Sequence, residues 1–410
     1  MPRLPRHSLA SATAVTALLT AVAVTASAAP ALAAPARYAP STTGSPAHHR
    51  PTAERTALQR ALDAVTAEGV PGVVAEVRDE HGVWRGASGS ADRESGRPAR
   101  ADDRFRVGSV TKSLVATVVL QLVAEDRLKL DEPVERHLPV LVPAGPNGER
   151  VTVRQLLNHT SGLPDYLTDV LVDLSKPKEV VDRLREVGRT TYAPRELVGK
   201  AVALGWKFAP GEKGAWSYSN TNYVVLGLLV EHVTGRTLAQ EITGRVIRPL
   251  GLRDTSFPTT ARMPGRHLNG YEWAPGAAAP VDFTTFDPSA IWSTGTVIST
   301  AHDLNTFFRA LSGGRLLPPH LTEEMRRAIP MGKDRAGRSY GLGLETDTRS
   351  CGPTAPVRGH SGSVAGYNTF SFGTADGKRQ VTIAMNRNFS KSPAADGAAA
   401  RFLTAALCPK

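Results

Sequence analysis

The hydrophobic and polar positions of the chain predict strands near both ends and helices between them. Residues 53–68 have apolar side chains at helical spacing, and Gly69 ends this predicted helix. Residues 70–77 and 82–87 have the pattern of two short strands joined by a turn, and residues 357–385 return to β-branched, alternating strand character. We therefore expect one sheet built from the two ends of the chain with a helical insertion, an α+β or α/β architecture.

One internal segment is apolar nearly all round. Residues 109–126 place Leu and Val side chains on every face of a helix, which is typical of a helix buried inside a larger body. Residues 151–250 have mostly helical spacing with Pro and Gly breaks, and the chain has no visible internal repeat. The middle of the sequence therefore predicts the helical insertion.

The first 33 residues have the pattern of a secretory signal peptide. Arg3 and Arg6 precede an apolar run over residues 9–25, and small-residue triplets end at Ala28 and Ala33. We expect cleavage after Ala33, with an uncleaved anchor as the alternative.

The next segment, residues 34–52, is rich in Pro, Ala, Ser and Thr, which is typical of a flexible spacer. Residues 53–410 are then predicted to form the folded domain. No stretch in them is apolar for long enough to cross a bilayer. We therefore expect a secreted, extracellular protein without a stable membrane anchor.

Composition and charge exclude several classes of protein. The 410 residues are 41% hydrophobic, which is enough for a large core and rules out a disordered tail protein. The net charge is +11, but the Lys and Arg residues are dispersed and not interleaved with aromatics, which argues against nucleic-acid binding. No metal motif, Walker loop, GxSxG elbow or Rossmann fingerprint is present, so we expect no metal and no cofactor.

The chain has two cysteines, Cys351 and Cys408. Without a CxxC spacing or a nearby His pair, they do not predict a thiolate zinc site. In an oxidising compartment we expect them to form one disulfide that ties the end of the chain to its body. The alternative is two separate buried thiols.

Ser109 and Lys112 have the spacing of a serine nucleophile and its base. Three residues apart on a helix, their side chains share one face with about 5–6 Å between Cβ atoms, so the amine can accept the hydroxyl proton. Lys112 must be neutral for this, and burial and the positive end of the helix dipole both lower its pKa. Gly108 permits the close approach that presents the hydroxyl at the helix start, where backbone N–H groups also point.

The spacing alone is weak evidence. A second copy, Ser175 and Lys178, contains Pro177, and no apolar run follows it, so it lacks the context of a buried helix. The alternative for Ser109 is a helix-capping serine with a surface lysine one turn later.

A second candidate element is formed by Tyr218 and Asn220. They follow a Pro-Gly turn and precede the helical run of residues 223–233. A phenol near a lysine can relay protons, and an Asn amide can both donate to and accept from a bound amide. Taken singly, a core aromatic and a helix cap are the simpler interpretations.

The third element is the run His360, Ser361, Gly362 and Ser363, which leads into a strand. Its glycine lies where a substrate backbone can pack against a strand edge. Taken singly, His360 is a satisfied strand residue. The three elements in this order favour a catalytic interpretation.

Together, these motifs resemble those of the active-site-serine penicillin-recognising enzymes, in particular the secreted D-alanyl-D-alanine carboxypeptidases related to class C β-lactamases. The resemblance covers most of residues 54–408. Similar counterparts exist there for residues 105–113, 157–163 and 340–344 and for the two cysteines.

The resemblance implies an antiparallel sheet packed by helices, an all-helical lobe, and a catalytic cleft between them. It implies that Ser109 forms an acyl-enzyme and that Lys112 and Tyr218 are the proton-transfer pair. His360 takes the place of the lysine of class C β-lactamases, and the N–H groups of Ser109 and Ser363 form the oxyanion hole. The implied substrate-binding residues are Asn220, Ser361, Gly362 and Ser363.

Some positions depart from the carboxypeptidase pattern. Ser361 and Ser363 replace two threonines but keep the hydroxyl groups. Leu171 lies near the place where relatives carry an aromatic residue. The apolar side of the cleft is therefore expected to differ.

A further departure concerns recognition of the substrate's carboxylate. Glu345 falls where the relatives have the arginine that holds it, and a carboxylate there repels a free C-terminus. Arg349 or Arg358 are the candidates to substitute, and Arg358 shares a strand face with His360. A surface arginine is the alternative for each.

The leading expectation is a monomeric serine D-alanyl-D-alanine carboxypeptidase that acts on peptides with a D-alanyl end and is acylated by β-lactams. An esterase, a D-amino-acid-specific peptidase or a β-lactamase on the same scaffold is the alternative that Glu345 favours. A non-catalytic penicillin-binding receptor is the third hypothesis.

Overall fold

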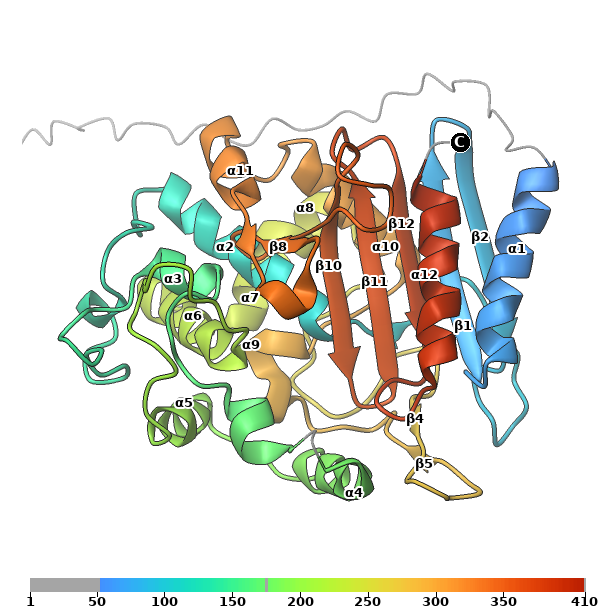
Figure 1. Cartoon of the computed structure of the whole chain (residues 1–410), viewed down its shortest axis with the longest axis horizontal. Coiled ribbons are helices and arrows are strands. Elements are labelled where there is room, and N and C mark those ends of the chain that lie inside the picture. The colour runs from blue at the N-terminus through green and yellow to red at the C-terminus, as the bar shows by residue number, and fades with distance from the viewer. Residues whose placement is uncertain (1–51, 174–175, 409–410) are drawn as a thin grey trace, which may run out of the picture. The chain divides into compact units, whose positions relative to one another are not determined.

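An eight-stranded antiparallel sheet carries the fold (Figure 1). The computed structural model describes residues 52–173 and 176–408. The strand order is β2-β1-β12-β11-β10-β9-β8-β7. The bounds are β1 Gly72–Asp79, β2 Gly82–Gly89, β7 Ile329–Pro330, β8 Arg338–Tyr340, β9 Glu345–Asp347, β10 Val357–Val364, β11 Tyr367–Thr374 and β12 Gln380–Met385.

The two ends of the chain meet in this sheet, as the hydrophobic pattern predicts. β1 pairs with β12 along its length, with Val73 opposite Met385 and Arg78 opposite Gln380. Two small sheets pair β3 (Phe105–Arg106) with β6 (Ile298–Ser299) and β4 (Tyr271–Glu272) with β5 (Val281–Asp282).

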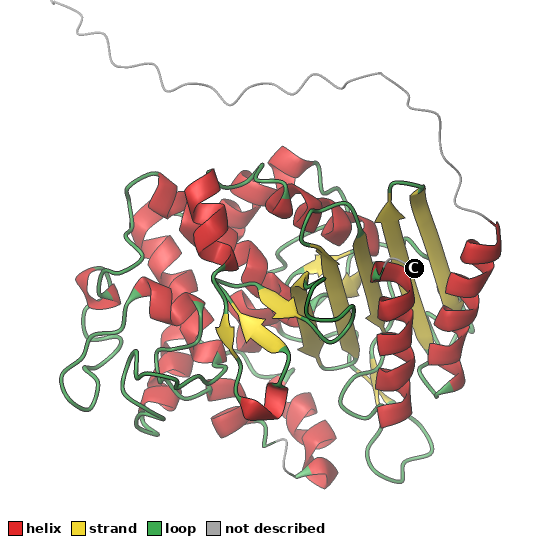
Figure 2. Ribbon diagram, turned by 45° about the horizontal axis from the view of Figure 1, so that its top comes forward, coloured by secondary structure: helices red, strands yellow, loops and turns green. Residues whose placement is uncertain are grey.

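Helices cover both faces of the sheet (Figure 2). α1 (Thr52–Ala67) and α12 (Pro393–Leu407) pack together on one face, where Leu62 and Phe402 join the strand residues Val73 and Ile383 in one hydrophobic cluster. α10 (Ala301–Ser312) packs against β11 and β12 from the opposite side. The sheet is therefore buried on both faces.

The remaining helices form the lobe beside the sheet, in agreement with the predicted helical insertion (Figure 1). They are α2 (Thr111–Ala124), α3 (Val153–Leu157), α4 (Pro177–Val187), α5 (Pro194–Val202), α6 (Asn220–Thr234), α7 (Leu238–Ile242), α8 (Arg248–Leu250), α9 (Trp292–Gly295) and α11 (Pro319–Arg326). Short 3-10 segments are η1 (Gly108–Val110), η2 (Val134–Arg136), η5 (Pro288–Ile291) and η6 (Lys333–Arg335), and π segments are η3 (Tyr166–Leu171) and η4 (Thr243–Ile247).

The predicted buried helix over residues 109–126 is shorter in the structure. It begins with the 3-10 turn η1, continues as α2, and ends at Ala124 because Asp126 has a φ of 55°. Eleven of its side chains in α2 are buried, so its position inside the lobe agrees with the apolar pattern.

None of the helices in the described part of the chain has both the length and the apolar composition that crossing a membrane requires. The predicted signal peptide, nearly all of the spacer, and Ser175 of the second Ser-x-x-Lys copy lie outside the described residues.

Candidate active site

A cavity of about 290 Å³ lies where the lobe meets the edge of β10. It brings together Ser109, Tyr218, Asn220, His360, Ser361 and Ser363, which come from the three predicted elements. Its other lining residues are Asp165, Leu167, Thr168, Ile291, Thr294, Gly295, Met331, Arg335, Glu345, Val364 and Phe389.

Lys112 is completely buried at the base of this cavity. Its Nζ lies 3.2 Å from Ser109 Oγ, the contact that the three-residue spacing predicts. The same nitrogen donates to Asn220 Oδ1 at 2.8 Å and to the Thr294 carbonyl at 2.9 Å. The amine therefore has three oxygen neighbours, and one of them is the serine hydroxyl.

Burial lowers the pKa of Lys112 to about 7, although Asp165 and Glu345 raise it. An amine with this pKa is substantially neutral at neutral pH. A neutral amine has two N–H donors and one lone pair. Asn220 and Thr294 can accept from the two donors, which leaves the lone pair for the proton of Ser109.

Asn220 lines the cavity, and its amide also makes contacts inside the protein. Its Nδ2 donates to Asp165 Oδ2 at 2.8 Å, and its Oδ1 accepts from Lys112. Asn220 is 6% exposed. The structure adds a contact that the motif did not predict, because Asn220 bridges Lys112 to a buried carboxylate, while its contact with a substrate stays a prediction.

That carboxylate, Asp165, was missed by the sequence analysis. It also caps η3 by accepting from the N–H of Leu167 at 2.9 Å. Burial raises the pKa of Asp165, although the backbone N–H of Leu167 and Lys112 lower it. The local signal was an Asp after a proline and before an apolar run, but nothing local indicates the contact with Asn220, 55 residues away.

Tyr218 is a further neighbour of Ser109. Burial raises its pKa well above the usual value, and a hydrogen bond with Ser109 opposes this shift. The phenol is therefore neutral and carries its proton. The ring packs on buried His159, with ring centroids 4.3 Å apart, and Lys112 Nζ lies 5.0 Å from the centroid of the phenol ring.

Two glycines let the backbone of η1 press against β10. A Cβ on Gly362 would lie 1.9 Å from the Val107 carbonyl oxygen, and a Cβ on Gly108 would lie 2.7 Å from the Ser363 nitrogen. Gly108 also has a φ of 54°, which favours glycine. This contact places the backbone N–H groups of Ser109 and Ser363 at one cavity, as the oxyanion-hole prediction requires.

His360 is the residue that the resemblance places where class C β-lactamases have a lysine, and it lines the cavity. It is 1% exposed, and burial lowers its pKa to about 4, so the imidazole is neutral. Nε2 lies 2.7 Å from Tyr340 Oη, and Nδ1 lies 2.5 Å from the Ser361 carbonyl and 3.3 Å from Glu345 Oε1. His360 borders the cavity and positions its neighbours.

Glu345 lies in the cavity wall, but its charge is compensated. Arg338 pairs with its Oε2, while Oε1 accepts from the Ser361 N–H at 3.1 Å and from the Ser361 hydroxyl at 2.7 Å. Burial raises the pKa of Glu345, but His360, Arg338 and the hydrogen bonds of Ser361 outweigh it and hold the pKa below its usual value. The carboxylate is therefore ionised, and it holds Ser361.

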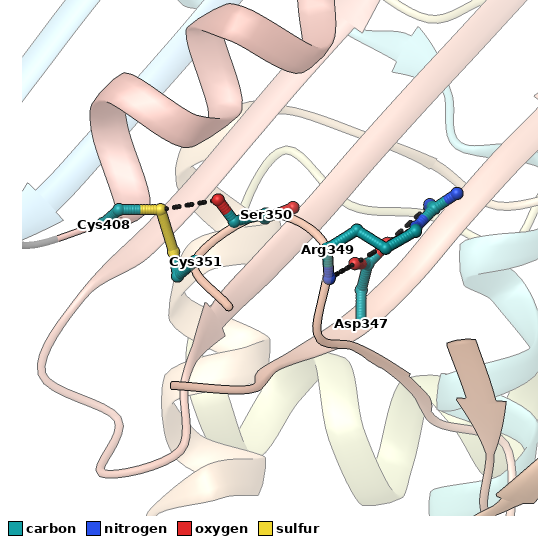
Figure 3. Close-up of a disulfide and its surroundings, with 5 residues drawn as sticks. All are labelled: Asp347, Arg349, Ser350, Cys351 and Cys408. Carbon is teal, nitrogen blue, oxygen red and sulfur yellow. Dashed lines mark hydrogen bonds and ion pairs between the residues drawn. A yellow bond between two sulfur atoms is a disulfide. The ribbon is translucent and has the colours of Figure 1, made fainter. Parts of the chain in front are cut away.

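Neither arginine proposed to replace the carboxylate-binding residue lines the cavity. Arg349 pairs with Asp347 at 2.6 Å, next to the disulfide (Figure 3). Arg358 lies beside Arg326 at a separate small pocket. Arg335, which no motif singled out, is exposed and lines the cavity instead.

Leu171 is also not a cleft residue. It is 6% exposed and belongs to the hydrophobic core, because its position at the end of η3 turns it inward. Leu167 and Thr168, one turn earlier, line the cavity.

The two cysteines form a disulfide between the residues after β9 and the end of α12 (Figure 3). Cys408 follows the last helix, and Cys351 lies 57 residues earlier. The bond thus ties the end of the chain to its body. Among the described residues, no group of three or more His, Cys, Asp or Glu side chains is placed to hold a metal ion.

Known proteins of one family resemble the chain. Residues 58–406 match the family model described as Beta-lactamase. The chain is 34% identical to Esterase EstB of Burkholderia gladioli over 352 residues, which cover 77% of this chain and 86% of that protein. It is 29% identical to a D-aminopeptidase of Cereibacter sphaeroides over 373 residues, which cover 87% of this chain and 64% of that protein.

Solved structures resemble the chain over most of its length. A D-stereospecific amidohydrolase from Streptomyces sp. has 39% sequence identity and a TM-score of 0.74, covering 83% of this chain and 96% of that one. The D-amino acid amidase from Ochrobactrum anthropi SV3 has 27% identity and a TM-score of 0.74, covering 86% of this chain and 98% of that one.

Proposed function

The chain belongs to the beta-lactamase family and is a serine hydrolase of that fold, and from this premise we propose that it hydrolyses amide or ester bonds at the carbonyl of D-amino acid residues. The observation that carries the proposal is the buried amine of Lys112, whose remaining oxygen neighbour is Ser109 Oγ at 3.2 Å. The D-stereospecific amidohydrolase and the D-aminopeptidase support the choice of substrate.

In the proposed reaction, neutral Lys112 accepts the proton of Ser109, and Oγ attacks the carbonyl carbon of the substrate. The N–H groups of Ser109 and Ser363 stabilise the tetrahedral oxyanion. The proton passes from Lys112 through Tyr218 to the leaving nitrogen or oxygen, and the C–N or C–O bond breaks. Ser109 then carries the acyl group.

Water completes the cycle along the reverse proton path. The water attacks the acyl carbonyl, its proton moves to the Lys112–Tyr218 pair, and that pair returns a proton to Ser109 Oγ. The carboxylic acid leaves, so atoms and protons balance without a cofactor. Asn220 and Asp165 position Lys112 in this scheme.

Glu345 favours substrates without a free carboxylate next to the broken bond. It lies on the cavity wall, paired with Arg338 and Ser361, so this position offers no free positive charge to an anionic leaving group. Amides and esters of D-amino acids need no such charge. The resemblance of the chain to Esterase EstB supports the inclusion of esters.

Arg335 favours a second candidate, a D-alanyl-D-alanine carboxypeptidase. Its exposed side chain lines the cavity. A cation there can accept the terminal carboxylate of a peptide. β-Lactams are then expected to acylate Ser109 in either case.

We propose that the enzyme acts outside the cytoplasm. The signal-peptide pattern of the first 33 residues and the Cys351–Cys408 disulfide both support this, since disulfides persist in oxidising compartments. A mature N-terminus found beyond Ala33 in the culture medium is the expected result.

One substrate panel tests the proposal. We expect hydrolysis of D-phenylalanine amide and its methyl ester, far slower hydrolysis of the L-enantiomers, and loss of activity in Ser109→Ala. If D-alanine is instead released faster from a diacylated Lys-D-Ala-D-Ala peptide, and Arg335→Gln removes this activity, the carboxypeptidase is correct. Sustained turnover of a cephalosporin alone would contradict both.

A further inference from the structure

The proposed reaction predicts which end of β10 binds the leaving group and which end binds the acyl part of the substrate. Tyr218, which protonates the leaving group, packs on His159, and both lie beside Tyr340, the partner of His360. The leaving group therefore lies at the His360 end of β10. The acyl part of the substrate extends the other way, toward Ser363 and the end of the strand.

A second and larger cavity lies beyond that end. Its volume is about 500 Å³, and it opens between α4, the turn after β4 and the turn after β12. Figure 1 shows α4 and β4 at the end of the sheet toward which β10 points. Its lining residues are Val180, Val181, Trp273, Ala274, Pro275, Gly276, Ala277, Arg387, Phe389, Ser390 and Lys391.

Phe389 lies between the two cavities, because it lines both. Its side chain is 37% exposed, unusual for a large apolar residue of this protein. The backbone under it is firmly held: the fully buried carboxylate of Glu272 accepts from the N–H groups of Phe389 at 3.0 Å and Ser390 at 2.9 Å. Asn388 Nδ2 donates to the Val364 carbonyl at 3.2 Å and ties the turn to the end of β10.

The larger cavity combines apolar walls with positive charge. The guanidinium of Arg387 stacks on Trp273, 4.4 Å from the ring centroid, and donates to the Gly69 carbonyl at 2.9 Å. Burial lowers the pKa of Arg387, and the charge of the buried Glu272 carboxylate opposes this shift. Lys391 lines the same cavity and pairs with Asp396 at 3.3 Å. An occupant with an apolar body and a carboxylate fits this lining.

We propose that this second cavity binds the acyl-side extension of the substrate, the group attached to the nitrogen of the D-residue whose carbonyl Ser109 attacks. The group it favours has a short apolar stem and a carboxylate. The inference rests on the proposed function, and it adds that the preferred substrates are N-acylated or peptidyl D-amino acid derivatives.

Two chromogenic substrates test this: the 4-nitroanilides of N-succinyl-D-phenylalanine and N-acetyl-D-phenylalanine, which differ in the carboxylate. In the wild-type protein we expect kcat/KM to be about tenfold or more higher for the succinyl substrate, which corresponds to one charge-assisted contact. Added salt reduces this ratio.

Two variants in the exposed turn after β4 test whether the second cavity causes the preference for the succinyl substrate. Ala277→Trp places a large ring in the second cavity and is expected to reduce kcat/KM for the succinyl substrate to the level of the acetyl substrate, without changing the latter. The matched control is Ala278→Trp, because Ala278 is also exposed but does not line the cavity. We expect this control to keep the wild-type ratio.

The results that contradict this inference differ from those that contradict the proposed function. Equal kcat/KM for both substrates in the wild-type protein, or an equal loss for both in Ala277→Trp, overturns this inference and leaves the proposed function standing. Hydrolysis of neither 4-nitroanilide, with D-phenylalanine amide still hydrolysed, overturns this inference alone. Hydrolysis of none of these D-substrates overturns the proposed function as well.

Discussion

At the scale of single residues, the chemistry depends on the partners of one amine. The contact of Lys112 with Ser109 could be predicted because three residues along a helical turn bring two side chains together. Its other partners could not, since Asn220 and Thr294 come from distant elements and nothing local encodes those contacts. The same holds for Asp165, which the sequence analysis missed.

Replacing the amine tests its role as base. Lys112→Met keeps a similar volume and removes the lone pair, so kcat/KM is expected to fall by about 10²–10⁴-fold. The melting temperature is expected to stay the same or rise, because a buried amine is costly. Steady-state kinetics and thermal unfolding measure both. Lys207→Met, at a partly exposed lysine paired with Asp169, is the control, and equal activity in both variants would exclude the role.

The pKa of Lys112 sets a pH dependence. Only the neutral amine accepts the proton of Ser109, so kcat/KM is expected to rise about tenfold per pH unit below about 7 and to level off above it. The profile should be measured between pH 5 and 9 with N-acetyl-D-phenylalanine 4-nitroanilide, which has no titrating group in this range. A flat profile, or one that falls as the pH rises, would contradict the assignment.

At the scale of elements, the site is the contact between η1 and β10. The glycines on its two sides, Gly108 and Gly362, could be predicted from the motifs, which also predict Ser109 on a regular helix. The structure has a 3-10 turn there, because Gly108 takes a positive φ so that the backbone can meet the strand. His360 was placed on the right strand, but its burial depends on Tyr340 and Glu345, which only the folded sheet brings to it.

The backbone contact can be tested with one methyl group. Gly362→Ala puts a Cβ 1.9 Å from the Val107 carbonyl oxygen, so η1 and β10 must separate. The N–H groups of Ser109 and Ser363, which we propose as the oxyanion hole, then move apart. We expect kcat to fall by about 10²-fold or more, as for the loss of an oxyanion-hole donor. Gly199→Ala in α5 meets no atom within 4 Å and is the control.

Kinetics of the purified variants, with circular dichroism to verify folding, decide this prediction. A folded Gly362→Ala protein with wild-type kcat would show that the close approach is not needed for the reaction.

At the scale of the whole molecule, the two ends of the chain build one sheet, and this could be predicted from the strand patterns at both ends. The arrangement of the lobe could not, since its helices share similar apolar patterns and only their packing decides their order. The resemblance to known enzymes supplied that architecture. Substrate identity could be predicted least, because the side chains that line the cavity include Arg335 and Phe389, which no motif contains.

The disulfide is expected to act on stability and not on catalysis. It closes a loop of 57 residues, for which chain entropy gives about 4 kcal/mol of stabilisation. The double variant Cys351→Ser/Cys408→Ser should therefore unfold at lower denaturant concentration with unchanged kcat, because neither cysteine lines the catalytic cavity. Loss of kcat in a folded double variant would contradict this.

The central claim is that Ser109 is acylated by D-amino acid derivatives through the buried amine of Lys112. The direct measurement is mass spectrometry of the protein quenched within its first turnovers of D-phenylalanine methyl ester, followed by peptide mapping. We expect a phenylalanyl adduct on the peptide that contains Ser109, with little adduct from the L-ester and none in Ser109→Ala. An adduct on another residue, or equal labelling by both enantiomers, would contradict the account.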